Sequence, residues 1–274
     1  MPARSVLITG CSSGIGRATA EHLKSRGWRV IASARKTKDV AALQAAGFEA
    51  LPLDVADAAE VERAVREAEA LTGGLDALVN NAGIAVPGAI EDLSRENWQR
   101  QFDVNFFGAM DLTQRVLAGM RRRGRGHIVM VSSILGRVAM PWRGAYNASK
   151  FALEGATDSL RLELRGSGIG VSLVNPGPIQ SRFRDNSLDN FEAGVQAAGS
   201  VHDATYARLK AETGAHKDRQ PFTLGPEAVA VKIACALESP RPKARYYVTF
   251  PAYALSAARC LLPTAWMDAL LARL

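Results

Sequence analysis

Short apolar runs alternate with longer segments of helical period along most of this chain, and this alternation restricts the fold more than any other feature. Most of the runs are continuously apolar, which is typical of strands buried on both faces of a parallel sheet. They cover residues 5–9, 28–33, 48–55, 75–81, 127–133, 170–176 and 246–250. Helical periodicity is found between them, at 14–26, 57–71, 94–120, 146–165 and 226–238. This order predicts one doubly wound α/β domain over residues 1–274, with a parallel sheet of about seven strands.

The composition agrees with a globular domain that has no membrane span. Of the 274 residues, 47% are hydrophobic and 22% are charged, so a sizeable core is expected. The chain has no run of 18 apolar residues, and its first residues lack the hydrophobic region and cleavage site of a signal peptide. The three cysteines are scattered without metal-ligand spacing, so no metal site is expected. These features favour a reducing, cytoplasmic setting.

The net charge of +7 raises the question of an anionic partner. The densest basic cluster, RRRGRG at 121–126, follows an amphipathic stretch and precedes an apolar run. Arginines at that place are typical of a helix C-terminus, where they offset the helix dipole. Because no nucleic-acid motif accompanies the cluster, no nucleic-acid partner is expected.

Two segments depart from the regular alternation. Residues 178–224 form a long polar stretch between the last two predicted strands, and a loop of this length is usually a lid over a binding site or a disordered excursion. The tail, 251–274, is apolar and amphipathic but is interrupted by Pro263. We expect the 178–224 segment to be a substrate lid. The tail is expected to pack on the domain or on an oligomer partner, with peripheral membrane contact as the alternative.

A glycine-rich turn follows the first predicted strand and opens the first predicted helix. Gly10, Gly14 and Gly16 let the backbone turn sharply and approach a pyrophosphate, while the helix N-terminus supplies free N–H groups. Ser12 and Ser13 add hydroxyl donors, and Ile15 lies within the same turn. The strand–turn–helix context therefore predicts dinucleotide binding.

The end of the second predicted strand indicates which dinucleotide is bound. NAD-binding folds usually place an acid about 20 residues beyond the glycines, whereas an arginine suits a 2′-phosphate. Ala34 stands there instead, followed by Arg35 and Lys36, while the nearest acid, Asp39, fits the first turn of the next helix. With no carboxylate to repel a phosphate and a guanidinium to bind one, the sequence predicts NADP(H).

Small and polar residues also follow the third and fourth strands. Asp54 and Val55 come after the third, and Asn81, Ala82 and Gly83 after the fourth, where a backbone can pass close to a flat adenine and ribose. Asn105 lies inside a helix-like stretch, although asparagine competes for backbone hydrogen bonds. Either Asn105 is a tolerated surface residue, or it holds the helix open to coordinate something.

The assembled motifs resemble those of the short-chain dehydrogenase/reductase family. The resemblance covers residues 4–182 and rests on the glycine turn, Asn80-Asn81-Ala82-Gly83, Asn105, Ser133, Tyr146-xxx-Lys150 and Pro176-Gly177. It implies a Rossmann-type fold, a nicotinamide cofactor and hydride transfer to or from a carbonyl or alcohol. Overall, the run 136–164 is most similar to the branch with 17β-hydroxysteroid and retinol dehydrogenases and bacterial aldehyde reductases.

The resemblance implies a catalytic set of Asn105, Ser133, Tyr146 and Lys150. A tyrosine with a pKa near 10 exchanges protons poorly at neutral pH, so the pKa of Tyr146 must fall by about 3 units. A lysine one helical turn away acts in that direction and, in the family, also holds the nicotinamide ribose. Ser133 would hydrogen-bond the substrate oxygen, and Asn105 would position a water that links the lysine to solvent.

Further family positions border the nicotinamide and the substrate. The resemblance places the nicotinamide carboxamide near Pro176, Gly177 and Ile179, and Ser181 stands where the family often has threonine. The stretch between Ser133 and Tyr146 should line the substrate side of the pocket. Its apolar members favour a lipophilic carbonyl or alcohol, although some of them could be plain core: Leu135, Val138, Met140 and Trp142.

Two other functions stay open at this point. A 3-oxoacyl-carrier-protein reductase would share the motifs, and its surface arginines would meet an acidic carrier protein; the 178–224 segment and the apolar tail weigh against it. A catalytically silent NADP(H)-binding sensor or scaffold is disfavoured by the complete catalytic set. Because the family commonly pairs through its Asn- and Tyr-bearing helices, a homodimer or homotetramer is expected.

Overall fold

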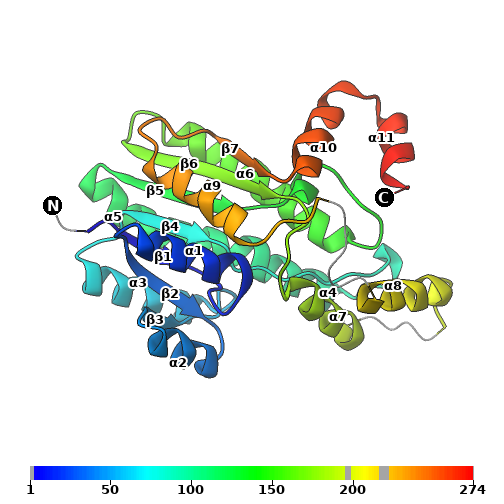
Figure 1. The fold of residues 1–274 in the computed structure, drawn as a ribbon, viewed down its shortest axis with the longest axis horizontal. Helices are drawn as coiled ribbons and strands as arrows, with labels where there is room; N and C mark the ends of the chain where they lie inside the picture. The colour runs from blue at the N-terminus through cyan, green and yellow to red at the C-terminus, as the bar shows by residue number, and fades with distance from the viewer. Residues whose placement is uncertain (1–2, 195–198, 216–221, 274) are drawn as a thin grey trace.

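The computed structural model describes residues 3–194, 199–215 and 222–273, and its centre is a parallel sheet of seven strands (Figure 1). The strand order is β3-β2-β1-β4-β5-β6-β7. The strands are β1 (Ser5–Ile8), β2 (Arg29–Ala34), β3 (Glu49–Pro52), β4 (Ala77–Asn80), β5 (Gly126–Val131), β6 (Ile169–Pro176) and β7 (Arg245–Val248). The predicted doubly wound fold is confirmed, and every predicted strand is present with its ends shifted by a few residues.

Helices cover both faces of the sheet. One face packs on α1 (Gly14–Ser25), α2 (Thr37–Ala45) and α9 (Glu227–Glu238), and the other on α3 (Ala58–Thr72), α5 (Gly108–Arg123) and α6 (Gly144–Glu163). In β1, Val6 and Ile8 point to the first face and Leu7 to the second, all fully buried. This two-sided burial explains why the strands are continuously apolar rather than alternating.

The helix expected at 94–120 consists of three pieces. They are α4 (Arg95–Phe102), a π-helical turn (Asp103–Phe107) and α5, which extends to Arg123. Gly124 then adopts the left-handed conformation, with φ 63°, that commonly ends a helix. The three arginines of the last turn, residues 121–123, confirm the predicted helix C-terminus.

The 178–224 segment contains two helices that the sequence did not indicate. They are α7 (Phe183–Gly194) and α8 (Asp203–Ala215); residues 195–198 and 216–221 lie outside the described residues. The two ends of the segment meet, because the backbone N–H of Gln180 donates to the carbonyl of Leu224 at 2.9 Å. For its described residues, reading the segment as a loop was therefore wrong. The apolar residues of these two helices show only weak helical periodicity, so the sequence pattern does not indicate them.

Tertiary contacts attach α8 to the loop after β4. The hydroxyl of Tyr206 accepts a hydrogen bond from the backbone N–H of Ala89 at 2.9 Å and donates to Asp92. Ser200 also donates to Asp92, at 2.7 Å. The carboxylate of Asp92 thus holds the start of α8, and these hydrogen bonds keep the pKa of Asp92 below its usual range.

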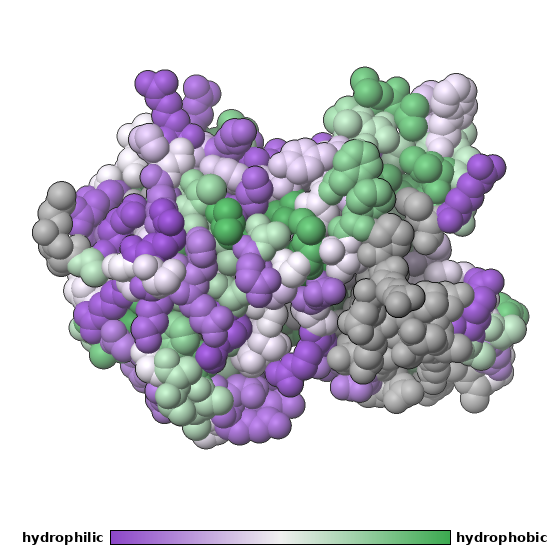
Figure 2. All heavy atoms as spheres, in the orientation of Figure 1, coloured by the Kyte–Doolittle hydropathy of each residue, from purple (hydrophilic) through white to green (hydrophobic). Residues whose placement is uncertain are grey.

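The C-terminal tail folds into α10 (Phe250–Leu261) and α11 (Thr264–Leu271), with Pro263 at the break. Ala252, Met267 and Leu271 are buried against the domain, so the prediction that the tail packs on the domain is confirmed. Hydrophobic residues also gather on the outside of these helices (Figure 2), where Leu261 is 80% and Trp266 67% exposed. In the described part of the chain, no helix is long and apolar enough to cross a membrane.

Candidate active site

The glycine-rich turn forms a shallow cradle between β1 and α1. Gly10 and Gly14 have φ of +72° and +57°, which L side chains rarely adopt, and a Cβ on Gly16 would lie 2.2 Å from the carbonyl oxygen of Gly10. Asn81 closes the turn by donating from Nδ2 to the carbonyls of Thr9 and Gly10, at 2.8 and 3.3 Å. The extended residue before α1 is Ser13, whose side chain does not cap the helix. These features fit a pyrophosphate at the helix N-terminus.

The other residues expected to contact the cofactor lie at the ends of neighbouring strands. Arg35 is exposed directly after β2, and Asp54 follows β3, where its Oδ1 accepts from the backbone N–H of Ala56 at 3.0 Å. After β4, the backbone N–H groups of Asn81 and Ala82 both donate to Oγ1 of Thr9 at 2.9 Å. Because β3, β2, β1 and β4 are neighbours in the parallel sheet, the residues that follow them lie along the same carboxyl edge of the sheet. Four more predicted residues lie along this edge: Ser12, Ile15, Val55 and Gly83.

The turn after β6 reaches back to the glycine-rich turn. The backbone N–H of Gly177 donates to the carbonyl of Val248 at 2.9 Å, and a Cβ on Gly177 would lie 2.2 Å from Oγ1 of Thr249. Ser181 lies so close to Gly14 that a Cβ on that glycine would be 3.1 Å from the serine Cβ. The Pro176–Ser181 turn, including Ile179, therefore borders the same cradle.

Asn105 is buried in the π-helical turn and bridges three parts of the chain. Its Oδ1 accepts from the backbone N–H of Ile84 at 2.9 Å, and its Nδ2 donates to the carbonyl of Ile84 at 3.0 Å and to Oγ of Ser149 at 3.1 Å. It is only 2% exposed, so it is not a surface residue. Because π-helical turns often occur at functional sites, its geometry favours the alternative in which it holds the helix open.

Ser133, Tyr146 and Lys150 are brought together at the carboxyl end of β5. Ser133 follows β5 and caps a 3-10 turn, Ile134–Gly136, by accepting from the backbone N–H of Leu135 at 3.1 Å. Tyr146 and Lys150 lie one turn apart on α6, with Nζ 5.8 Å from the centre of the phenol ring. Nζ donates to the carbonyl of Val131 at 2.9 Å, and all three side chains are buried.

Burial controls the ionisation of both titratable residues. It raises the pKa of Tyr146, against the opposing effects of a hydrogen bond with Ser133 and the charge of Arg143. It lowers the pKa of Lys150 to about 8, against the opposing charge of Glu154. For the protein chain itself, the pKa of Tyr146 is therefore raised and not lowered, contrary to the expectation. Desolvation of the phenolate dominates, and the ammonium is directed at the carbonyl of Val131.

Tyr146 belongs to an apolar cluster. The cluster contains Leu135, Val138 and Met140, three of the four apolar residues predicted between Ser133 and Tyr146. It also contains residues that sequence reasoning missed: Phe183, Ala252, Met267 and Leu271. The ring of Phe183 packs edge-on against Tyr146, with centroids 5.7 Å apart. The one local signal for this contact was the aromatic character of Phe183 shortly after the Pro176-Gly177 turn.

Trp142 is not in this cluster. Its ring packs edge-on against His202 and Tyr206, with centroids 5.0 and 6.3 Å apart, so it contacts the start of α8. Its backbone has φ 63°, which is unusual for a bulky residue, and its ring packs in a different cluster from the other three predicted substrate contacts. Trp142 therefore anchors α8 in this structure.

The comparisons with known proteins decide the family. The family described as short chain dehydrogenase matches residues 4–191. The chain is a short-chain dehydrogenase/reductase. It is 44% identical to the uncharacterized oxidoreductase YbbO of Escherichia coli K12, over 98% of this chain and 94% of that protein.

Other relatives of this dehydrogenase have more specific names. Human retinol dehydrogenase 8 is 43% identical, over 68% of this chain and 62% of its own length. The NADPH-dependent 3-dehydrocapnine reductase of Ornithobacterium rhinotracheale is 33% identical, over 97% and 95%.

Solved structures agree with the fold. A short-chain dehydrogenase from Streptomyces avermitilis has a TM-score of 0.78 at 30% identity, covering 99% of this chain and 95% of that one. A Burkholderia phymatum short-chain dehydrogenase/reductase in complex with NAD also has a TM-score of 0.78, at 28% identity, covering 94% and 92%.

The buried lysine of this dehydrogenase should lower its stability at neutral pH. Below pH 8 the ammonium of Lys150 is charged in both folded and unfolded states, and its burial costs about 3 kcal/mol, from the lowering of its pKa from 10.5 to about 8. Lys150→Met removes this cost and one hydrogen bond, so the variant should be about 2 kcal/mol more stable at pH 7.

The pH dependence separates this effect from better packing. As pH rises from 8 through 10.5, the folded lysine loses its proton first, so the native protein no longer bears the burial cost and the advantage of the variant disappears. Urea unfolding of both proteins at pH 7 and pH 10.5 measures it. A difference that stays the same at both pH values would contradict the explanation.

Proposed function

We propose that the protein transfers a hydride between NADP(H) and a lipophilic carbonyl or alcohol, with Tyr146 as the proton donor or acceptor. The observation that carries this proposal is the convergence of Tyr146, Ser133 and Lys150 next to an apolar cluster. A carbonyl oxygen placed against the phenol would have a proton donor and a hydrogen-bonding hydroxyl within the same water-poor site.

Each residue of the site has a definite task in this proposal. When bound, the nicotinamide dinucleotide supplies the hydride that reduction requires, or accepts it in oxidation. Tyr146 gives its phenol proton to the substrate oxygen in reduction and takes it back in oxidation. The hydroxyl of Ser133 hydrogen-bonds that oxygen as negative charge develops on it. Lys150 stabilises the tyrosinate by its charge and binds the ribose, and Asn105 holds the loop after β4 in place.

The strand ends form the proposed dinucleotide site. The turn with Gly10, Gly14 and Gly16 would hold the pyrophosphate, Asp54 and Val55 the adenine, and the Asn81–Gly83 loop the adenosine ribose. The Pro176–Ser181 turn would bind the carboxamide. Arg35 is proposed to bind the 2′-phosphate. The relatives support either cofactor, since one is named NADPH-dependent and a similar structure contains NAD.

The choice of cofactor should depend on Arg35. Replacing Arg35 with alanine should raise the KM for NADPH at least about tenfold, because a hydrogen bond to a charged group contributes about 1.5–3 kcal/mol. The KM for NADH should change little, since NADH has no 2′-phosphate. Arg165→Ala is the matched control, because Arg165 is also exposed but follows α6, at the amino end of β6. A native protein that prefers NADH, or equal losses with both cofactors, would refute the assignment.

The α7–α8 segment is proposed to act as the substrate lid. Phe183 contacts Tyr146 at one end, and Tyr206 is attached to the loop after β4 at the other. With α10 and α11 it makes the substrate side largely apolar, which favours a lipophilic substrate.

Phe107 and Phe151, on the Asn- and Tyr-bearing helices, are 57% and 41% exposed. They are candidates for the dimer or tetramer interface, which stays a prediction.

A substrate panel tests the proposed function. Oxidation of NADPH and NADH is followed with aldehydes, steroid ketones, retinal and 3-oxoacyl thioesters. Turnover of the lipophilic aldehydes or ketones supports the proposal. Preference for the 3-oxoacyl thioesters would instead identify a carrier-protein reductase. Tight NADPH binding without any turnover would identify a sensor or scaffold.

A further inference from the structure

A buried carboxylate lies behind the proposed catalytic residues and has no part in the chemistry above. Glu154 is on α6, one helical turn after Lys150, and is 4% exposed. A buried carboxylate is costly unless it is paired and hydrogen-bonded. Its partners therefore indicate why it is there.

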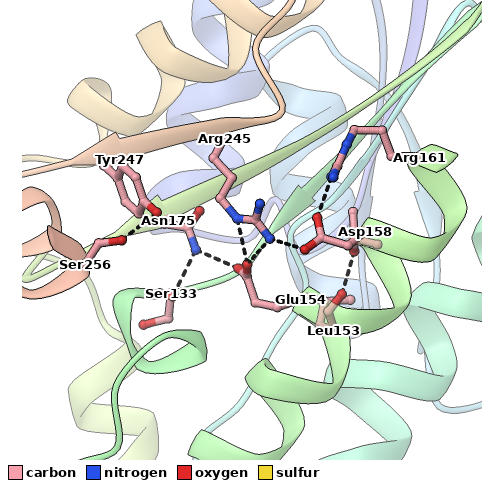
Figure 3. Close-up of polar contacts among 10 residues, drawn as sticks. Ser133, Leu153, Glu154, Asp158, Arg161, Asn175, Arg245, Tyr247 and Ser256 are labelled. Atoms are coloured by element: carbon pink, nitrogen blue, oxygen red, sulfur yellow. Dashed lines mark hydrogen bonds and ion pairs between the residues drawn. The ribbon is translucent and has the colours of Figure 1, made fainter. Parts of the chain in front are cut away.

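Two donors bind the two oxygens of this carboxylate (Figure 3). Nδ2 of Asn175 donates to Oε1 at 2.6 Å, and Nε of Arg245 donates to Oε2 at 3.1 Å. Because both partners are donors, the group they fit is an ionised carboxylate. Asn175 is on β6 and Arg245 is the first residue of β7, so Glu154 joins α6 to two strands.

Asn175 connects the carboxylate to the backbone of Ser133. Its Nδ2 also donates to the carbonyl oxygen of Ser133, at 3.1 Å. That oxygen accepts a second hydrogen bond from the backbone N–H of Gly136, at 3.0 Å, which closes the 3-10 turn. Figure 3 shows Asn175 between Glu154 and Ser133.

The same turn also rests directly on Glu154. A Cβ on Gly136 would lie 2.9 Å from Cγ of Glu154 and 2.8 Å from Oγ of Ser132. A side chain at position 136 would therefore clash with Glu154, and glycine lets the turn approach α6 this closely. The position of the Ser133 hydroxyl thus depends on Glu154 both by contact and through Asn175.

The charge of Glu154 also acts on Lys150. The negative charge favours the ammonium form and therefore raises the pKa of Lys150, whereas burial lowers that pKa. The other charged groups that face Glu154 are Arg245 from β7, at 3.1 Å, and Asp158 from α6, which shares that guanidinium. The contacts from β6 and from the 3-10 turn come from Asn175 and Gly136, which do not titrate.

We propose that Glu154, held by Arg245, is a positioning residue of the active site: it fixes the Ser133 turn through Asn175 and faces Lys150 with its negative charge. Its importance for catalysis rests on the proposed function, whereas its hold on the turn does not.

Three variants separate these effects. Glu154→Leu removes the charge and both hydrogen bonds. Glu154→Gln keeps the shape but has one acceptor oxygen, so it can keep only one of the two contacts. Asp158→Asn is the matched control: it removes a charge from the same arginine, one turn further along α6, and contacts neither Asn175 nor Lys150 in the described structure. Urea unfolding is measured for all three.

Hydrogen exchange tests the hold on the turn without any need for turnover. Peptides that cover residues 132–138 should exchange about tenfold faster in both Glu154 variants than in the native protein and in Asp158→Asn. Peptides from α3 serve as the reference for global opening. Equal rates in the native protein and Glu154→Gln, or an equal rise in the α3 peptides, would overturn the assignment.

The pH profile tests the charge. Without the carboxylate, the protons of Lys150 and Tyr146 are both lost more easily, so the alkaline limb of kcat/KM for reduction should move about one unit toward lower pH in Glu154→Gln. At the optimum, kcat should fall about tenfold, because small displacements of catalytic groups reduce rates strongly. Asp158→Asn should keep the native limb and rate. Coinciding limbs for Glu154→Gln and the native protein would overturn the electrostatic part.

The two proposals fail in different ways. A native protein that reduces no carbonyl in the panel contradicts the proposed function, while hydrogen exchange still decides whether Glu154 holds the Ser133 turn. An active native protein whose Glu154→Gln variant has the native exchange rates and limb contradicts this inference alone.

Discussion

Replacing Tyr146 with phenylalanine is expected to reduce kcat for carbonyl reduction by about a hundredfold to ten-thousandfold, the usual contribution of a general acid. Phenylalanine keeps the buried ring and its contact with Phe183, whose centroid is 5.7 Å away, but has no proton to give. NADPH should bind with nearly the native Kd, because the glycine-rich turn is untouched. Steady-state kinetics and titration of NADPH fluorescence measure the two quantities separately.

The matched control for this variant is Tyr246→Phe. The hydroxyl of Tyr246 accepts from the backbone N–H of Lys243 at 2.9 Å, so the change also removes one hydrogen-bonded hydroxyl, but outside the site. Its kcat should stay within about twofold of the native value, since the loss of about 1 kcal/mol affects stability and not the reaction. Native turnover by Tyr146→Phe would eliminate the proposed mechanism.

Gly16→Ala is expected to weaken dinucleotide binding, with the Kd for NADPH rising about fivefold to a hundredfold, because overpacking of about 1–3 kcal/mol falls on the binding turn itself. The new Cβ would lie 2.2 Å from the carbonyl oxygen of Gly10 and 2.6 Å from Nδ2 of Asn81. The turn must open to relieve this contact, and the cradle for the pyrophosphate is then lost. The Tm should also fall, which a thermal scan without cofactor measures.

Gly155→Ala is the corresponding control, because it adds the same methyl group to a helix with nothing within 4 Å. Alanine is the better helix former, so this variant should gain about 0.5–1 kcal/mol and bind NADPH as the native protein does. If Gly16→Ala also binds NADPH like the native protein, the glycine-rich turn is not the dinucleotide site.

The central sheet and the residues at its strand ends could be predicted from the sequence because their signals are local. A strand buried on both faces is largely apolar, as β1 and β4 are apart from one polar residue each, Ser5 and Asn80, so a short apolar run predicts it. The glycines of the first turn are required by the backbone conformation there, with φ of +72° at Gly10. Asn105 was noticed as an unfavourable helix residue, and it lies within a π-helical turn.

The surroundings of Tyr146 could not be predicted in the same way. Phe183, Met267 and Leu271 come from α7 and α11, far along the chain, and join the cluster around Tyr146 only in the folded protein. Trp142 was expected as a substrate contact because it is apolar and lies between Ser133 and Tyr146, yet its ring packs against His202 and Tyr206. The pKa of Tyr146 is a similar case, because the extent of burial, which raises it, is not a local property.

The sequence by itself determined the α/β architecture, the dinucleotide turn and the set of Ser133, Tyr146 and Lys150, because backbone conformation and helical spacing are encoded within short stretches. Only the tertiary structure decided how Phe183 and the tail pack in one cluster with Tyr146, and how Glu154 is joined to Ser133. That connection depends on a helix and two strands meeting through Asn175 and Arg245. Buried charges need partners that satisfy them from several directions, and only a completed fold can place those partners.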